Sequence, residues 1–156
     1  MLTIENIKSN FSYIKAIFDN SESYHNTDNY FNLGDFTDIY FESINQNVKQ
    51  EQIDIYNSFK LNHTKYLSEI EQYFIKYLNN YELNHIDQIK QKELFFDVIY
   101  IPNKNNNYDL ALICSREYQK YFIFKKSISL RVEFKNNSIS SVKRPKNITN
   151  ENSINN

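Results

Sequence analysis

The chain has 156 residues, a formal net charge of −1 and a mean hydropathy of −0.68, yet 16% of its residues are Tyr or Phe. Its only glycine, Gly34, excludes a P-loop, a GxGxxG dinucleotide turn and a GxSxG nucleophile elbow, because each of these motifs needs at least two glycines. Its only cysteine, Cys114, excludes an intrachain disulfide and a cysteine-based zinc cluster. The length predicts a single domain.

The first segment has apolar residues at spacings of three and four, which is typical of one face of an amphipathic helix. Thr3 is its expected N-cap. The stripe comprises Ile4, Ile7, Phe11, Ile14 and Phe18. The segment 19–43 that follows contains six carboxylates and no Lys or Arg, and its last part, FTDIYFES at 36–43, has the alternation of a strand.

A second helical region covers residues 48–80, where Asn47 and Gln50 resemble a capping box. Apolar residues recur at helical spacing through this region, and this pattern fits either one long helix or two helices broken near Leu61–Thr64. We favour the break. Its most pronounced stripe comprises Tyr66, Leu67, Ile70, Tyr73, Phe74, Tyr77, Leu78 and Tyr81.

From residue 94 the apolar period changes to two, which indicates consecutive strands. We expect strands at 94–101, 108–115, 118–126, 128–134 and 138–142, joined by short loops that imply antiparallel neighbours. The strand LFFDVIYI at 94–101 is apolar on both faces except at Asp97. The predicted fold is α+β, with N-terminal helices followed by an antiparallel β-meander of four to five strands. One domain would cover residues 1–143, and the aperiodic, Asn-rich residues 144–156 would form a disordered tail.

The sequence offers no catalytic constellation and no metal site. His25, His63 and His85 are scattered, and none has a second metal-ligating residue type four positions away. His25 lies near Glu22 and Asp28, but a solvated loop histidine is the favoured interpretation. Cys114 lies in an apolar run, which favours a buried and inert thiol. We therefore expect no catalytic residue, no metal and no cofactor. Asp97 needs a partner if it is buried, and Arg131 or Arg116 on a neighbouring strand would be suitable.

Charge is unevenly distributed along the chain. The net charge is +1 over residues 1–18, −7 over 19–54 and +5 over 55–156. Carboxylates steer a cationic partner and tyrosines supply contact area, so the acidic segment predicts a surface for a basic protein, although a solvated acidic loop is the alternative. The residues expected to bind the partner are Glu22, Tyr24, Asp28, Tyr30, Asp35, Asp38, Tyr40 and Glu42. The net charge of −1 does not favour nucleic acid.

No 18-residue apolar run and no signal peptide are visible, so we expect a cytoplasmic protein without a membrane partner. The sequence does not decide between a monomer and a homodimer.

Three stretches together resemble small bacterial domains that are suspected immunity proteins of polymorphic toxin systems. They are VKQEQIDIYNSFKLNHTKYLSEIEQYFIKYL, FFDVIYIPNKNNNYDLALICS and ISLRVEFKNNSIS. The resemblance covers residues 36–142 and rests on the order of a helical stretch before a meander. It implies a non-enzymatic domain that binds and neutralises a cognate toxin.

Two other functions stay open. One is a small enzyme or ligand-binding domain with a site around Asp97 and Arg131, and the other is a structural protein that self-associates through the aromatic helix 64–81.

Overall fold

The structure of the protein, a computed structural model, describes residues 1–16, 21–28, 37–90, 93–103, 107–121 and 124–144. Its strands are β1 (Ser12–Lys15), β2 (Glu22–Asp28), β3 (Thr37–Ser43), β4 (Phe95–Ile101), β5 (Leu110–Tyr121), β6 (Phe124–Lys135) and β7 (Ser138–Lys143). Its helices are α1 (Ile4–Asn10), α2 (Gln50–Leu61), α3 (His63–Phe74), the 3-10 turn η1 (Ile75–Tyr77), α4 (Asn80–Leu83) and α5 (Ile86–Lys90).

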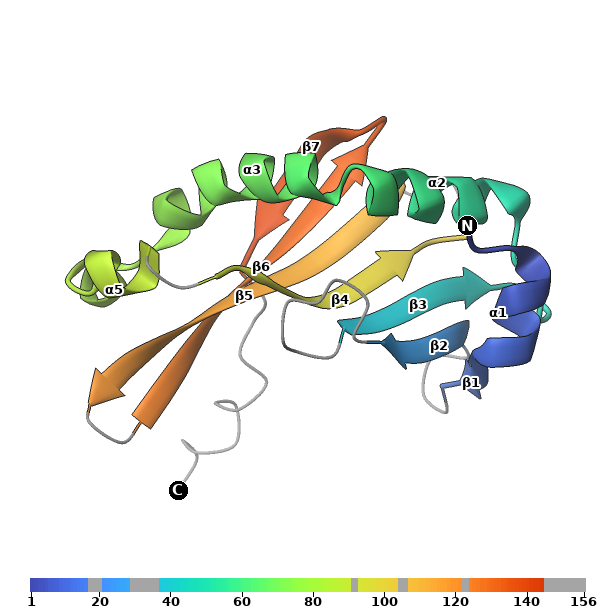
Figure 1. Cartoon of the computed structure of the whole chain (residues 1–156), viewed down its shortest axis with the longest axis horizontal. Helices are drawn as coiled ribbons and strands as arrows, with labels where there is room; N and C mark the ends of the chain where they lie inside the picture. The colour runs from blue at the N-terminus through green and yellow to red at the C-terminus, as the bar shows by residue number, and fades with distance from the viewer. Residues whose placement is uncertain (17–20, 29–36, 91–92, 104–106, 122–123, 145–156) are drawn as a thin grey trace, which may run out of the picture.

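The fold is α+β, built on one seven-stranded sheet in which the strands lie in chain order from β1 to β7 (Figure 1). Neighbouring strands are antiparallel except β3 and β4, which run parallel. Parallel neighbours need a long crossover connection, and helices α2 to α5 supply it here. The expected meander of four to five strands after the helices was therefore wrong in two respects, because the described residues form seven strands and β1 and β2 also precede α2. The strand predicted at 36–43 is confirmed as β3.

The N-terminal segment also differs from the expectation of one helix reaching Phe18. Thr3 caps α1 as predicted, with its Oγ1 accepting a hydrogen bond from Asn6 N at 3.2 Å. The helix ends at Asn10, and Ser12–Lys15 then pairs with β2. Phe18 lies outside the described residues. An apolar spacing of three and four was misleading here because Ile14 lies on a strand and is 40% exposed.

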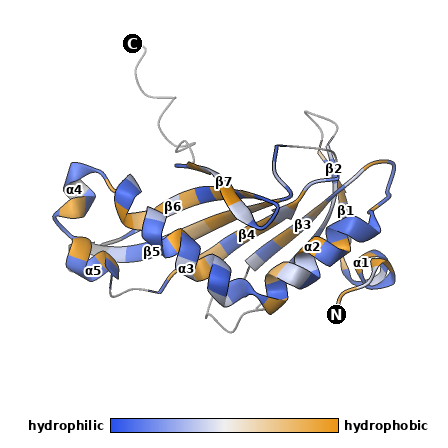
Figure 2. Cartoon of the chain, turned by 90° about the horizontal axis from the view of Figure 1, so that it is seen from above, coloured by the Kyte–Doolittle hydropathy of each residue, from blue (hydrophilic) through white to orange (hydrophobic). Residues whose placement is uncertain are grey.

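The core lies between the sheet and the helices on one side of it. Helices α1, α2 and α3 lie along the same side of the sheet (Figure 2). The aromatic stripe predicted on the second helical region packs into this core, where Tyr66 is 6% exposed and Ile70 and Phe74 are fully buried. The predicted break is confirmed, because α2 ends at Leu61 and α3 begins at His63. Among the described helices, none combines the length and the apolar character needed to cross a lipid bilayer.

The last strands form a longer hairpin than expected. Ile128, Leu130, Val132 and Phe134 of β6 face the core, as their alternation predicts, and each is at most 1% exposed. The separate strands expected at 108–115 and 118–126 were wrong, because Leu110–Tyr121 is one continuous strand. The charged pair at 116–117 does not interrupt β5.

Arg116 explains why β5 continues. Its guanidinium is paired with Glu71 of α3 and lies 5.3 Å from the ring centroid of Phe74, so this cation faces the helices rather than a loop. At the next turn, Asn136 and Asn137 both have positive φ, as a two-residue type I′ hairpin turn requires, and the predicted strand after them is confirmed as β7.

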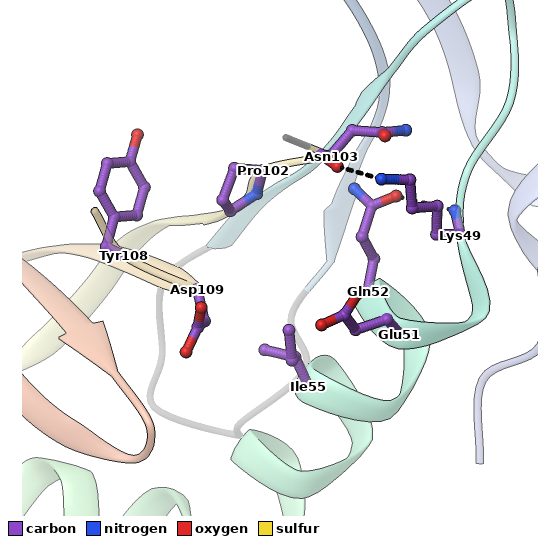
Figure 3. A pocket seen from close by; sticks show the side chains of 8 residues that line it. All are labelled: Lys49, Glu51, Gln52, Ile55, Pro102, Asn103, Tyr108 and Asp109. Carbon is purple, nitrogen blue, oxygen red and sulfur yellow. Dashed lines mark hydrogen bonds between the residues drawn. The ribbon is translucent and has the colours of Figure 1, made fainter. Parts of the chain in front are cut away.

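A buried polar junction fixes the N-terminus of α2 against the ends of the two parallel strands (Figure 3). The helix begins at Gln50, with Lys49 rather than Asn47 at the N-cap position. Gln52 is 2% exposed, and its Nε2 donates to the carbonyl oxygens of Glu42 at 2.9 Å and Ile101 at 3.0 Å. Lys49 Nζ donates to the carbonyl oxygen of Asn103 at 2.8 Å.

The end of the described chain is tied to the helical layer. Arg144, the first residue of the expected tail, donates through Nη1 and Nη2 to the two carboxylate oxygens of Glu82 at 2.8 and 2.7 Å. Glu82 is 1% exposed and also caps α4, because its Oε2 accepts from Asn79 N at 2.8 Å. The expected disorder of residues 145–156 lies outside the described residues.

Candidate functional site

Helices α1, α2 and α3 lie along one face of the sheet, and we call the opposite face the open face. Helix α4 reaches the rim of the open face, where Asn79 and Glu82 line a pocket together with Ile113, Ser127 and Ser129. Successive side chains of a strand point to opposite faces, and β3 follows this rule strictly. Ile39 and Phe41 are at most 1% exposed in the core, whereas Asp38, Tyr40 and Glu42 are half-buried on the open face. Three of the predicted partner-binding residues thus lie in one row there.

An apolar hollow of about 360 Å³ lies in the open face beside this row. Tyr40 of β3 and Tyr100 of β4 are direct neighbours in the parallel register, and both border the hollow. Its lining residues are Ile14, Ala16, Ser21, Ser23, Tyr40, Val98, Tyr100, Ala111, Ile113 and Arg131. The hollow therefore draws residues from six strands, β1 to β6, and no single stretch of sequence encodes it.

Asp38 is held as a carboxylate by two neighbours on β2. Its Oδ1 accepts from Thr27 Oγ1 at 2.6 Å and lies 3.0 Å from His25 Nε2. Burial raises the pKa of Asp38, but the hydrogen bonds from Thr27 and His25 outweigh it and leave the pKa below its ordinary value. The His25 ring also stacks on Tyr40, with centroids 4.5 Å apart and planes at 26°. Because the Asp38 side chain is 40% exposed, it presents a fixed negative charge at the surface.

Arg131 also lies on the open face, but it bonds to Glu133 and Tyr108 rather than to the expected partner Asp97. Its Nε donates to Glu133 Oε1 at 2.9 Å and its Nη2 donates to the Tyr108 hydroxyl at 3.0 Å. Burial opposes ionisation of Glu133, yet its bonds to Arg131 and Lys143 keep its pKa below the ordinary value. Arg131 is thus a neutralised cation at the wall of the hollow.

Asp97 belongs to a different environment. Its Oδ1 accepts from Ser115 Oγ at 2.9 Å, it lies at a register shift between Phe96 and Val98, and it is not among the residues that line the hollow. Arg116, the other expected partner, pairs with Glu71 across the core side. Asp97 is therefore not part of the hollow that Arg131 borders.

Cys114 is fully buried, as its apolar surroundings in the sequence predict. Burial, together with the charge of Asp97, raises the pKa of its thiol. A thiol that stays protonated in the core is a poor nucleophile.

The other predicted partner-binding residues do not join the row on β3. Tyr24 is 7% exposed in the core, and its hydroxyl donates to Gln46 O at 3.3 Å. Glu22 accepts from Gln46 N at 3.2 Å, and this bond is the main reason that its pKa lies below the ordinary value. Asp28 ends β2 opposite Thr37, while Tyr30 and Asp35 lie outside the described residues.

Sequence reasoning missed the apolar half of the open face. The signal was present in LFFDVIYI, because a strand that is apolar on both faces is normally covered on both faces. Here Phe96, Ile99 and Ile101 fill the core, while Val98 and Tyr100 face the hollow. In the part of the chain that the structure describes, no three His, Cys, Asp or Glu side chains group closely enough to hold a metal ion.

No protein-family model matches the chain, and neither the curated proteins nor the solved structures gave a match.

Proposed function

We propose that the chain is a non-enzymatic protein-binding domain whose open face binds a basic protein. One observation carries the proposal: β4 is apolar on both faces, and the described helices cover only one of them. An apolar hollow at the surface that is bordered by a few polar groups is the usual form of a binding site. The resemblance to suspected immunity proteins leads us to propose further that the partner is a cognate toxin, which the chain neutralises by covering it.

Charge supports a basic partner. Asp38 and Glu42 flank Tyr40 on β3, and residues 19–54 carry a net charge of −7. Carboxylates around an aromatic contact steer a cationic protein and accept its Lys and Arg donors. The Asp38 carboxylate is especially suited to this because its lowered pKa keeps it ionised into the acid range and it is partly exposed.

The two alternative functions have weaker support. A site around Asp97 and Arg131 would need the two groups to converge on one pocket, and they have different hydrogen-bond partners. Self-association through the aromatic helix would need its stripe at the surface, and Tyr66, Ile70 and Phe74 pack beneath α3 instead.

The test is affinity capture from a lysate of the source cells, with Asp38→Lys compared with Glu51→Lys. Each variant reverses the charge of one carboxylate. Asp38 is half-exposed on the open face, whereas Glu51 is on the exposed side of α2. We expect a basic protein to bind the wild-type chain at about 50 mM salt and weakly at about 500 mM, because salt screens exposed charges. Asp38→Lys should abolish capture and Glu51→Lys should preserve it. Equal capture by both variants, or capture of nothing at either salt, would contradict the proposal.

A further inference from the structure

The hollow on the open face has the features of an anchor site, and we infer that it receives one aromatic side chain of the basic partner. This inference rests on the proposed function and specifies how the partner is recognised. The volume of about 360 Å³ is at the lower end of the ~300–1,000 Å³ found for ligand pockets. Binding energy at protein interfaces is concentrated in a few large side chains that fill such pockets.

The wall of the hollow favours a neutral anchor over a cationic one. Val98, Ala111 and Ile113 contribute apolar surface to it, and Ala111 is only 2% exposed. A Lys or Arg entering there would lose its hydration without gaining a carboxylate, because none of the described residues that line the hollow is acidic.

The same wall favours an aromatic ring over an aliphatic chain. Tyr40 and Tyr100 stand next to each other across β3 and β4, so an inserted ring has two aromatic partners at offset or edge-on geometry. Arg131 adds a guanidinium, which is attracted to aromatic faces and already lies 5.4 Å from the ring centroid of Tyr108. Ile14, which also lines the hollow, is 40% exposed and would be covered by the incoming residue.

The charges beside the hollow place the basic groups of the partner next to its anchor. Asp38 is two residues from Tyr40 on the same face of β3, outside the hollow lining but adjacent to it. A Lys or Arg that flanks the aromatic anchor in the partner would reach this carboxylate while the ring fills the hollow. The recognised chemistry is therefore an aromatic side chain flanked by basic ones.

Defined peptides test this inference directly, whatever the identity of the partner. The probe is N-acetyl-Lys-Phe-Lys-amide, compared with N-acetyl-Lys-Ala-Lys-amide, with binding followed by methyl NMR of the wild-type chain. We expect saturable shifts at Val98 and Ile113 with the Phe peptide and no response at Ile53 and Ile70, which are fully buried on the helical side. The Ala peptide should bind at least ~10-fold more weakly, because it lacks the anchor.

Two substitutions by phenylalanine, one inside the hollow and one outside it, provide a test variant and its control. Ala111→Phe places a ring in the hollow, whereas Ser127→Phe places the same ring at an exposed position of β6 that does not line it. Ala111→Phe should weaken the Phe peptide at least ~10-fold and Ser127→Phe by less than ~2-fold. Equal binding of the two peptides to wild type, or no methyl shift with either, overturns the inference even if Ala111→Phe fails to fold.

The two proposals fail in different ways. If capture of a basic protein is lost in Asp38→Lys but unchanged in a folded Ala111→Phe, the binding face stands and the aromatic anchor is wrong. If Asp38→Lys captures as well as wild type, the binding face itself is wrong.

Discussion

Replacing Gln52 by leucine should destabilise the protein far more than the same replacement of an exposed glutamine. The side chain is 2% exposed and makes three hydrogen bonds, two to the carbonyl oxygens of Glu42 and Ile101 and one from Lys49 N at 2.8 Å. Leucine has a similar volume, so the variant removes the hydrogen bonds without leaving a large cavity. Gln52 joins α2 to β3 and β4 at the same time.

The expected loss of stability depends on the polar groups that the substitution leaves without a hydrogen bond. Lys49 is exposed, so water can replace the lost bond to its N–H, but the Ile101 carbonyl belongs to a fully buried residue and the Glu42 carbonyl to a half-buried one. A buried polar group without a partner costs about 1–3 kcal/mol. For these two carbonyls we expect a loss of about 2–4 kcal/mol in the free energy of unfolding. At about 2–4 °C per kcal/mol for a chain of this size, Tm should fall by roughly 4–16 °C.

Urea unfolding of wild type, Gln52→Leu and the control Gln50→Leu provides the measurement. Gln50 is in the same helical turn but exposed, and its side chain donates to Asp54 four residues later, a contact worth about 0.2–0.5 kcal/mol. If Gln52→Leu lost less than ~1 kcal/mol, or no more than Gln50→Leu, the carbonyls would not depend on this amide and the reasoning on buried hydrogen bonds would be refuted.

Two further results are expected. Burial disfavours the charged form of Glu82, but the hydrogen bonds from Arg144 and Asn79 N outweigh burial and lower the pKa of this carboxyl. Its contribution to the free energy of unfolding is therefore complete above the unfolded pKa of about 4.3, and it is lost as the pH falls through the folded pKa. The stability difference between wild type and Glu82→Gln should therefore shrink between pH 7 and pH 3 in urea titrations, and a constant difference would show that the pair with Arg144 does not form. Cys114 is fully buried with a raised pKa, so a thiol reagent should label it only at the rate of opening or unfolding, and rapid labelling of the native protein would contradict its place in the core.

Sequence patterns over a few residues predicted those elements whose place in the core is set by their own apolar spacing. The inward row of Ile128, Leu130, Val132 and Phe134 and the turn at Asn136 follow from short-range periodicity and turn chemistry. Periodicity allowed one helix or two over residues 48–80, and the structure has two, α2 and α3. The α+β class followed from the change of period at residue 94.

Strands stabilised by distant partners were missed or misjudged. β1 and β2 have the sequences SYIK and ESYHNTD, which lack a clear apolar alternation, and they form a sheet because β3 supplies the hydrogen-bonding partner of β2. β5 continues through Arg116 because Glu71, on a helix far away in sequence, neutralises that cation.

The amino-acid sequence sets the composition of the candidate site: an acidic, tyrosine-rich β3 and a β4 that is apolar on both faces. Which of those residues meet depends on the tertiary structure. The parallel pairing of β3 with β4 puts Tyr40 beside Tyr100, and the helical crossover that this pairing requires covers one face and leaves the other open. Strand order and the choice of the covered face depend on contacts between residues far apart in the chain. The hydrophobic periodicity of a short segment does not reveal these contacts.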